Sequence, residues 1–248
     1  MQRSFATTVR KREVVPGCSV RLDELTDMTL ILAATNRREI VVGADTLVYE
    51  GSREIYRTYQ TPKLRRVAEH WVVGFTGLGN VAKIVWDFVE ASGNTFNPDI
   101  RIGVMECIRV MGEAYNEYRL NQDAKALLAG FSGNKPMIYT WEVARPSPSG
   151  GNLPPWGAIG CGSDLALYFA RNCEPLDRLT AQQLTALVYF SISEVAKSDL
   201  RVAKPIDIAV VRPEGIEIKE REFLSRTLEG PSERLAGLVA QNIRQLGP

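Results

Sequence analysis

The first candidate for chemistry in this sequence is a glycine-bearing corner. An apolar run with strand character, Trp71 to Phe75, ends at Thr76-Gly77-Leu78-Gly79, and a helical pattern begins near Val81. Glycines at a strand-to-helix corner allow close backbone approach, and they leave N–H groups free to face a ligand. The corner is therefore a candidate for facing a ligand, although Gly77 could be only a glycine at the entry to the helix.

Other kinds of site have less support. The single histidine, His70, is not accompanied by a nucleophile elbow, so a serine–histidine hydrolase is not indicated. A Gly-x-Gly fragment at Gly160-Cys161-Gly162 is weak evidence for phosphate binding, because no Lys-Ser/Thr pair supports it. The four cysteines show no metal or redox spacing; they are Cys18, Cys107, Cys161 and Cys173. We expect no cofactor and no metal.

Composition bounds the class of protein. A chain of 248 residues with 45% hydrophobic residues suits one sizeable domain with a substantial core. A formal charge of +1 and the lack of a basic stripe argue against nucleic-acid binding. No apolar run approaches the length of about 20 residues that spans a bilayer, so we expect no membrane association. The expectation is a soluble, cytoplasmic protein with an extension at 1–28 and a single domain at 29–248.

The elements that must position a site begin with a predicted β-hairpin. Two runs with strand character, Thr29 to Ala34 and Ile40 to Ala44, flank a polar turn at 36–39. The apolar runs are nearly continuous rather than alternating, so we expect their sheet to be covered on both faces. Read singly, Thr29 would be a structural β-branched strand residue, Asp45 a turn cap and Lys63 a solvated lysine.

Later segments have their own patterns. Helices are predicted at 78–91, 99–121, 164–171, 180–198 and 231–246, and strands around 126–142 and 204–211. The stretch from Arg145 to Trp156 is rich in Pro, Gly and Ser and is predicted to be a loop.

The order of these features resembles the proteasome β-type subunits and the bacterial peptidases related to them. The resemblance is carried by Gly43-Ala44-Asp45, Lys63-Leu64 and Gly74-Phe75-Thr76-Gly77. It implies the N-terminal-nucleophile hydrolase fold, an α+β four-layer αββα sandwich. The family's nucleophilic threonine matches Thr29, and its aspartate matches Asp45, sixteen residues downstream.

The resemblance assigns a role to each residue. Thr29, once it is the first residue, would use its own α-amine as base, with an ordinary pKa of about 7.7–8.0. The Lys63 ammonium would favour deprotonation of the amine and hydroxyl, and Asp45 would keep that lysine charged and oriented. The N–H of Gly77 would stabilise the oxyanion.

Supporting residues also follow from the resemblance. Ser163 matches a serine near the threonine amine, although it could instead cap the helix that follows. Asp199 matches an aspartate near the nucleophile, but Val202 stands where the family usually has a serine. Phe75 matches a position that lines the specificity pocket and suggests small or medium side chains before the cut, and Gly79 is expected to bind substrate.

The residues before Thr29 leave three alternatives open. They could be a propeptide that is removed, a permanent extension that keeps Thr29 in an amide bond, or an untranslated stretch before a start at Met28. The family's self-cleaving precursors usually carry glycine before the threonine, and Met28 is not glycine.

The function implied is a threonine-type endopeptidase that cleaves unfolded polypeptides inside self-associated rings, with an ATP-dependent unfoldase as a further partner. Two alternatives stay open. One is a non-catalytic structural subunit of such a ring, and the other is an amidase that acts on a small amide.

Overall fold

The computed structural model describes most of the chain from Thr29 onward. The described residues are 29–51, 56–67, 70–77, 87, 89, 91, 96, 97, 99–118, 124–151, 155–172, 175–222, 224, 226–228 and 230. The predicted extension at 1–28, Gly79, which is predicted to bind substrate, and the predicted helix at 231–246 lie outside these residues.

Two five-stranded antiparallel sheets form the centre of the molecule. The first sheet has the order β10-β1-β2-β11-β12. Its strands are β1 (Leu30–Thr35), β2 (Ile40–Asp45), β10 (Trp156–Gly160), β11 (Ile206–Arg212) and β12 (Gly215–Lys219). The second sheet has the order β5-β6-β7-β8-β9. Its strands are β5 (Leu64–Val67), β6 (Trp71–Thr76), β7 (Lys125–Ser132), β8 (Lys135–Glu142) and β9 (Arg145–Gly151).

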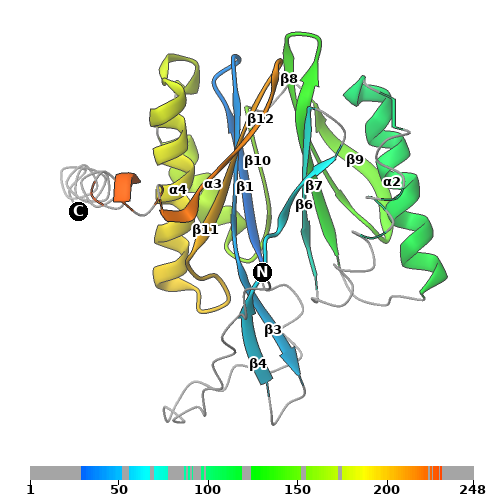
Figure 1. The fold of residues 1–248 in the computed structure, drawn as a ribbon, viewed down its shortest axis with the longest axis horizontal. Helices are drawn as coiled ribbons and strands as arrows, with labels where there is room; N and C mark the ends of the chain where they lie inside the picture. Colours follow the sequence, from blue (N-terminus) through cyan, green and yellow to red (C-terminus); the bar gives the residue numbers. More distant parts are fainter. Residues whose placement is uncertain are drawn as a thin grey trace, which may run out of the picture.

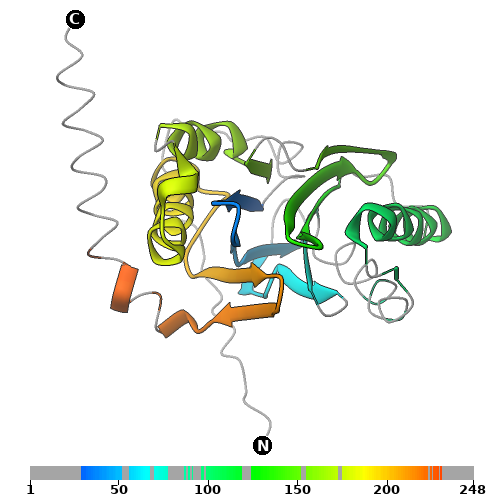
Figure 2. The same cartoon turned by 90° about the horizontal axis from the view of Figure 1, so that it is seen from above.

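Helices cover the outer faces of both sheets. α3 (Ser163–Arg171) and α4 (Ala181–Ser198) lie on the first sheet, and α2 (Ile100–Glu117) lies on the second. Seen from above, the layers follow one another as helix, sheet, sheet, helix (Figure 2). The predicted four-layer αββα sandwich is confirmed. A separate two-stranded ribbon, β3 (Leu47–Gly51) and β4 (Tyr56–Gln60), extends from one end of the sandwich (Figure 1).

Strand β1 is apolar throughout because both of its faces are buried. Leu30 and Leu32 pack in a cluster with residues of α3 and α4, whereas Ile31 and Ala33 pack in the cluster between the two sheets. Because successive side chains point to opposite faces, a strand buried on both sides needs apolar residues throughout. Gly43 of the neighbouring strand lets α4 approach, since a Cβ there would lie 2.6 Å from Val188 Cγ1.

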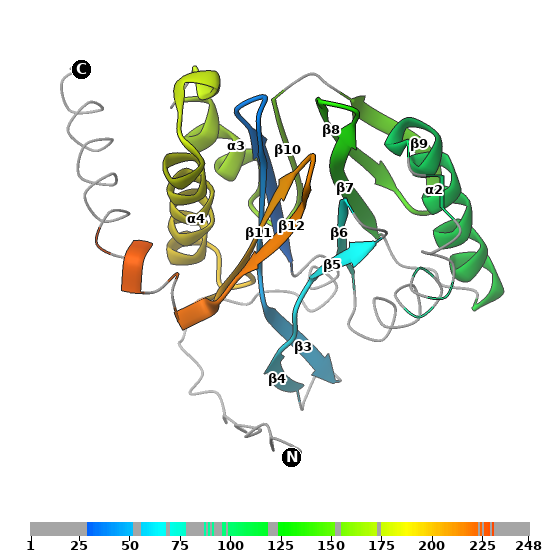
Figure 3. The same cartoon turned by 45° about the horizontal axis from the view of Figure 1, so that its top comes forward.

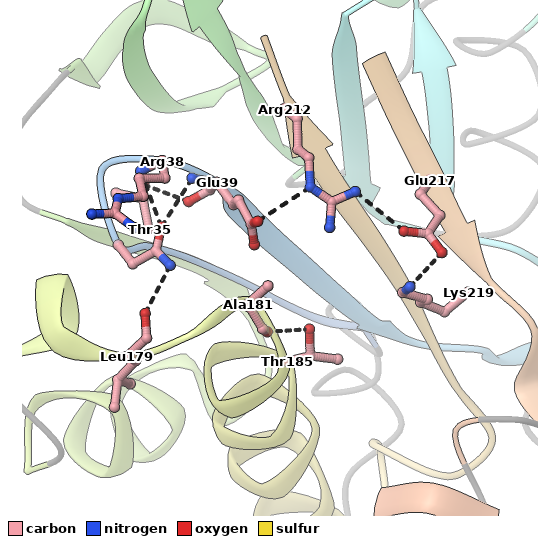
Figure 4. Close-up of polar contacts among 10 residues, drawn as sticks. Thr35, Arg38, Glu39, Leu179, Ala181, Thr185, Arg212, Glu217 and Lys219 are labelled. Atoms are coloured by element: carbon pink, nitrogen blue, oxygen red, sulfur yellow. Dashed lines mark hydrogen bonds and ion pairs between the residues drawn. The ribbon is translucent and has the colours of Figure 1, made fainter. Parts of the chain in front are cut away.

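The tip of the β1–β2 hairpin is fixed by side-chain hydrogen bonds (Figure 4). Asn36 Oδ1 accepts from the backbone N–H groups of Arg38 and Glu39, at 3.0 and 2.9 Å. Its Nδ2 donates to the Leu179 carbonyl at 2.9 Å, beside the short helix η3 (Leu176–Arg178). These bonds satisfy the turn's backbone and tie it to the helical layer, which sets the register that places Thr29 at the far end of β1.

One predicted element is wrong. The stretch predicted as a loop from Arg145 contains strand β9, which pairs with β8 at the edge of the second sheet. Proline is tolerated on an edge strand because the missing N–H need not serve a second neighbour. The register shifts between Thr140 and Glu142, so the pairing is irregular as well.

Candidate active site

Thr29 immediately precedes β1 and is buried, with 3% of its surface exposed. Its carbonyl oxygen accepts a hydrogen bond from the N–H of Cys161 at 2.9 Å. Cys161 directly follows β10, which pairs with β1 in the register Leu30↔Gly160. The position of Thr29 is therefore set by two neighbouring strands of the first sheet.

The β6 corner also reaches Thr29. Gly160 has φ +91°, and a Cβ built on it would lie 1.7 Å from the Thr29 carbonyl oxygen. The same point is 3.1 Å from Cγ2 of Thr76, the last residue of β6. Thr76 of the second sheet and Thr29 of the first thus both lie next to Gly160.

Gly77 follows Thr76 directly and has φ +142°, a conformation that L side chains rarely adopt. A Cβ there would lie 3.2 Å from Cε1 of Phe75. The Phe75 ring is itself buried in the cluster between the second sheet and α2. The glycine-bearing corner at Thr76-Gly77 therefore lies near Thr29. The buried Phe75 ring packs against Gly77.

Asp45 and Lys63 form a buried ion pair beside β1. Lys63 Nζ donates to both carboxylate oxygens of Asp45, each at 3.0 Å. Asp45 also accepts from the N–H of Leu30 at 2.9 Å and from that of Leu47 at 3.1 Å. The Asp45 side chain is fully buried, and that of Lys63 is 6% exposed. The carboxylate is thus joined to the residue that directly follows Thr29.

Burial acts on both members of this pair. It raises the pKa of Asp45, and the Lys63 charge and the hydrogen bonds that the carboxylate accepts oppose that rise. Burial likewise lowers the pKa of Lys63, against the charges of Asp45, Cys161 and Asp207. A buried lysine with a lowered pKa is suited to influence proton transfer near working pH.

Ser163 is the first residue of α3, so the alternative in which it caps that helix is wrong. The N-cap is Gly162, with φ +66° and no capping side chain. A Cβ at Gly162 would lie 2.3 Å from Val195 Cγ1, which fixes the turn against α4. Ser163 is half-buried, two residues after Cys161, so it starts close to the backbone that holds Thr29.

Asp199 and Val202 have other partners. The Asp199 carboxylate accepts from Arg201 Nε at 3.0 Å and Nη2 at 2.9 Å. Val202 is buried in the cluster between the first sheet and α4. Of the predicted site residues, Asp45 and Lys63 are bonded to each other, and Asp45 is bonded to the residue after Thr29. Gly77 follows Thr76, which lies next to Gly160, whereas Asp199 is held by Arg201.

Sequence reasoning missed Gly160 and Asp207. Gly160 stands in a fragment that was considered for phosphate binding and as the approach to Ser163, with no role for the glycine itself. Asp207 is a carboxylate within the apolar strand β11, and that contrast was the available signal.

Among the described residues, no group of three or more His, Cys, Asp and Glu side chains could hold a metal ion. In the same part of the chain, no helix combines the length and the apolar character needed to cross a membrane.

The fold and this site agree with a family model described as proteasome subunit, which matches residues 28–211. The chain belongs to the proteasome subunit family. Within this family its structure is similar to Anbu (ancestral beta-subunit) from Yersinia bercovieri, with a TM-score of 0.69 and 15% identity over 86% of this chain and 97% of that chain. It is also similar to an Anbu (Gly-1) mutant from Hyphomicrobium sp. strain MC1, with a TM-score of 0.71 and 15% identity over 89% and 98% of the two chains.

Identities of this size show a shared fold. No curated protein sequence matches the chain. The match of the proteasome subunit model begins at residue 28, and the described part of the chain begins at Thr29.

Proposed function

We propose that this proteasome-family protein is a threonine-type peptidase that cleaves unfolded polypeptide through an ester on Thr29. The observation that carries the proposal is the buried Asp45–Lys63 pair, tied to the N–H of Leu30 next to Thr29. Removing two charges from water costs several kcal/mol per ion, and well-packed apolar residues are often as stable in their place. A pair of this kind, bonded to the residue that follows Thr29, therefore favours a catalytic role.

The reaction requires Thr29 as the first residue. Its Oγ1 attacks the carbonyl carbon of the scissile peptide bond, and the hydroxyl proton passes to the α-amine. The Lys63 cation lowers the cost of forming the alkoxide, and the N–H of Gly77 faces the oxyanion. Collapse of the intermediate breaks the C–N bond, and the proton leaves with the new amine. Water then hydrolyses the ester and restores Thr29.

Four further residues would support the reaction or bind the substrate. Ser163 would support the α-amine, and Asp199 would help to order the site. Phe75 would limit the depth of the pocket before the cut, and Gly79 would contact substrate. Cleavage profiling of a peptide library should favour small or medium side chains at the residue before the cut. A preference for large aromatic side chains there would contradict the role of Phe75.

Self-association into rings, fed by an ATP-dependent unfoldase, would confine the site and restrict it to unfolded chains. A monomer or dimer in solution would instead favour the amidase alternative, because a small amide needs no enclosed chamber. Analytical ultracentrifugation of the chain separates these two cases.

The test is hydrolysis of fluorogenic peptide amides by a chain that begins at Thr29, released from a cleavable fusion. We expect turnover by this chain and its loss in Thr29→Ala and in Lys63→Ala. Thr29→Ser is the matched control, since it keeps the hydroxyl and the amine. Turnover that persists in Thr29→Ala would contradict the mechanism.

One observation favours a second candidate function, that of a non-catalytic ring subunit. Val202 is packed in the core where the family usually has a serine, and Asp199 is bound by Arg201. Under this alternative the chain that begins at Thr29 would assemble and show no turnover.

A further inference from the structure

A second carboxylate lies close to the candidate site, within strand β11. Ala209 and Val211 of this strand pack in the cluster between the sheets. Asp207 alternates with them and so faces the same side of the strand. It is buried, with 8% of its surface exposed. A carboxylate on an otherwise apolar, buried face needs a partner of opposite charge.

Strand pairing places Asp207 opposite Ala44, on the face of the first sheet that is turned to the second sheet. β11 is antiparallel to β2 in the register Ile206↔Asp45 and Asp207↔Ala44. β11 also contacts β5, which begins one residue after Lys63. Burial lowers the pKa of Lys63, and the charges of Asp45, Cys161 and finally Asp207 oppose that fall.

Asp207 is held from its other side by Arg221. Arg221 Nε donates to Oδ1 at 2.6 Å, and Nη2 donates to Oδ2 at 3.1 Å. Two parallel bonds of this kind fix both the position and the orientation of a carboxylate. Arg221 is helical and follows β12, the edge strand of the first sheet, by two residues. Figure 3 shows β12 beside β11. Leu224 and Leu228, which follow it, are buried in the cluster with α4 and anchor this segment.

We propose that Asp207, fixed by Arg221, is a positioning residue that holds the Lys63 side chain in its cationic form beside Thr29. It complements Asp45, which binds the lysine directly. The inference rests on the proposed function for its catalytic consequence, whereas the effect on Lys63 itself does not. It also links the segment after β12 to the site, through Arg221 and Asp207.

A purely structural role for the Asp207–Arg221 pair would leave Lys63 untouched. Its loss would lower stability without moving the titration of a lysine on another element. The measurement must therefore report on Lys63 rather than on folding alone.

The experiment is an NMR titration of the full chain with ¹³C-labelled lysine, in which the Lys63 signal is assigned by its loss in Lys63→Arg. In Asp207→Asn we expect the Lys63 midpoint to fall by about one pH unit, as for the loss of a nearby opposite charge. Asp99→Asn is the matched control, because Asp99, at the start of α2 and outside the site, also accepts bonds from one guanidinium, that of Arg101. An unchanged midpoint in Asp207→Asn, or an equal fall in Asp99→Asn, would overturn the inference.

A second readout is the pH profile of kcat/KM for the chain that begins at Thr29. Asp207→Asn should move the alkaline limb to lower pH by a similar amount, and Asp207→Glu should restore much of it. If that chain has no turnover, the proposed function fails while the Lys63 titration still decides the inference. If turnover is present and neither the midpoint nor the limb moves, the inference fails alone.

Discussion

Gly160 lies so close to Thr29 that a side chain at residue 160 would occupy the same space as the Thr29 carbonyl oxygen. A Cβ there would be 1.7 Å from that oxygen, and the backbone has φ +91°. Steric exclusion and backbone conformation both require glycine at this point. The strand that carries the Gly-x-Gly fragment thereby fixes the carbonyl of the proposed nucleophile.

Gly160→Ala should therefore displace Thr29. We expect loss of peptide hydrolysis and a fall of about 1–3 kcal/mol in the free energy of unfolding, from strain at a positive φ. Gly112→Ala on α2 is the control, because a Cβ there meets nothing within 4 Å. It should stabilise by about 0.5–1 kcal/mol, as alanine does for glycine in a helix. Urea unfolding and peptide hydrolysis measure both effects; full activity in Gly160→Ala would refute the placement.

The Asp45–Lys63 pair should behave as a buried ion pair that function retains. Lys63→Met leaves the Asp45 charge buried without its lysine and should cost about 3–5 kcal/mol of stability. The double variant Asp45→Asn with Lys63→Met should recover most of that cost, yet remain inactive. A double variant that is both stable and active would show that the pair serves only the fold.

The pH dependence of stability should differ between the wild type and that double variant. Burial raises the pKa of Asp45 above its ordinary 3.8, so the folded wild type binds more protons there than the unfolded chain. Its contribution to stability is therefore present below pH 3.8 and is lost as the pH rises through the folded value. As the pH rises from 3.8 through the folded value, the free energy of unfolding of the double variant should therefore increase relative to that of the wild type.

At alkaline pH, the stability of the double variant relative to the wild type should decrease again. Burial lowers the pKa of Lys63 from 10.5, so the unfolded wild type binds more protons between the folded value and 10.5, and its stability rises with pH there. Urea unfolding at a series of pH values gives the difference curve. A difference that does not change with pH would contradict the direction of both shifts.

Val202→Ser restores the hydroxyl that the family usually has, but it should not restore a functional contact. Val202 is 1% exposed and packs with the cluster under α4. A buried hydroxyl without a partner costs about 1–3 kcal/mol, and we expect that loss with unchanged turnover. A rise in kcat in Val202→Ser would instead place this side chain at the Thr29 amine.

The start of α4 offers a test of stability away from the site. Thr180 and Gln183 form a capping box, in which Thr180 Oγ1 accepts from Gln183 N–H and Gln183 Oε1 accepts from Thr180 N–H. Thr180→Ala should lower the free energy of unfolding by about 1 kcal/mol. Hydrolysis by the folded enzyme should not change, and a large loss of activity would show that α4 communicates with Thr29.

Local patterns predicted much of the fold. The hairpin on either side of residues 36–39 could be predicted because both strands are buried on two faces and are therefore apolar throughout. Helix α4 could be predicted from its N-cap and from the helical spacing of its apolar residues. Strand β9 was not, because the proline and glycine residues at 145–151 are typical of loops, and only pairing with the edge of β8 makes them a strand.

The site divides in the same way. Spacing and resemblance brought Thr29, Asp45, Lys63 and Gly77 together, because each is carried by a strand end of the same sandwich. The bonds of Asp199 to Arg201 and of Asp207 to Arg221 depend on local turns and on the path after β12, which hydrophobic periodicity does not encode. Gly160 was similarly hidden, since its role arises only when β10 pairs with β1.

The most direct test of the central claim is intact-mass analysis after reaction with a peptide epoxyketone, which consumes both a hydroxyl and a free α-amine on one residue. The chain that begins at Thr29 should gain one inhibitor per chain, located by fragmentation on Thr29, and Thr29→Ala should gain none. A folded chain that begins at Thr29 and gains no inhibitor, or one that gains it at another residue, would contradict the assignment of Thr29 as the nucleophile.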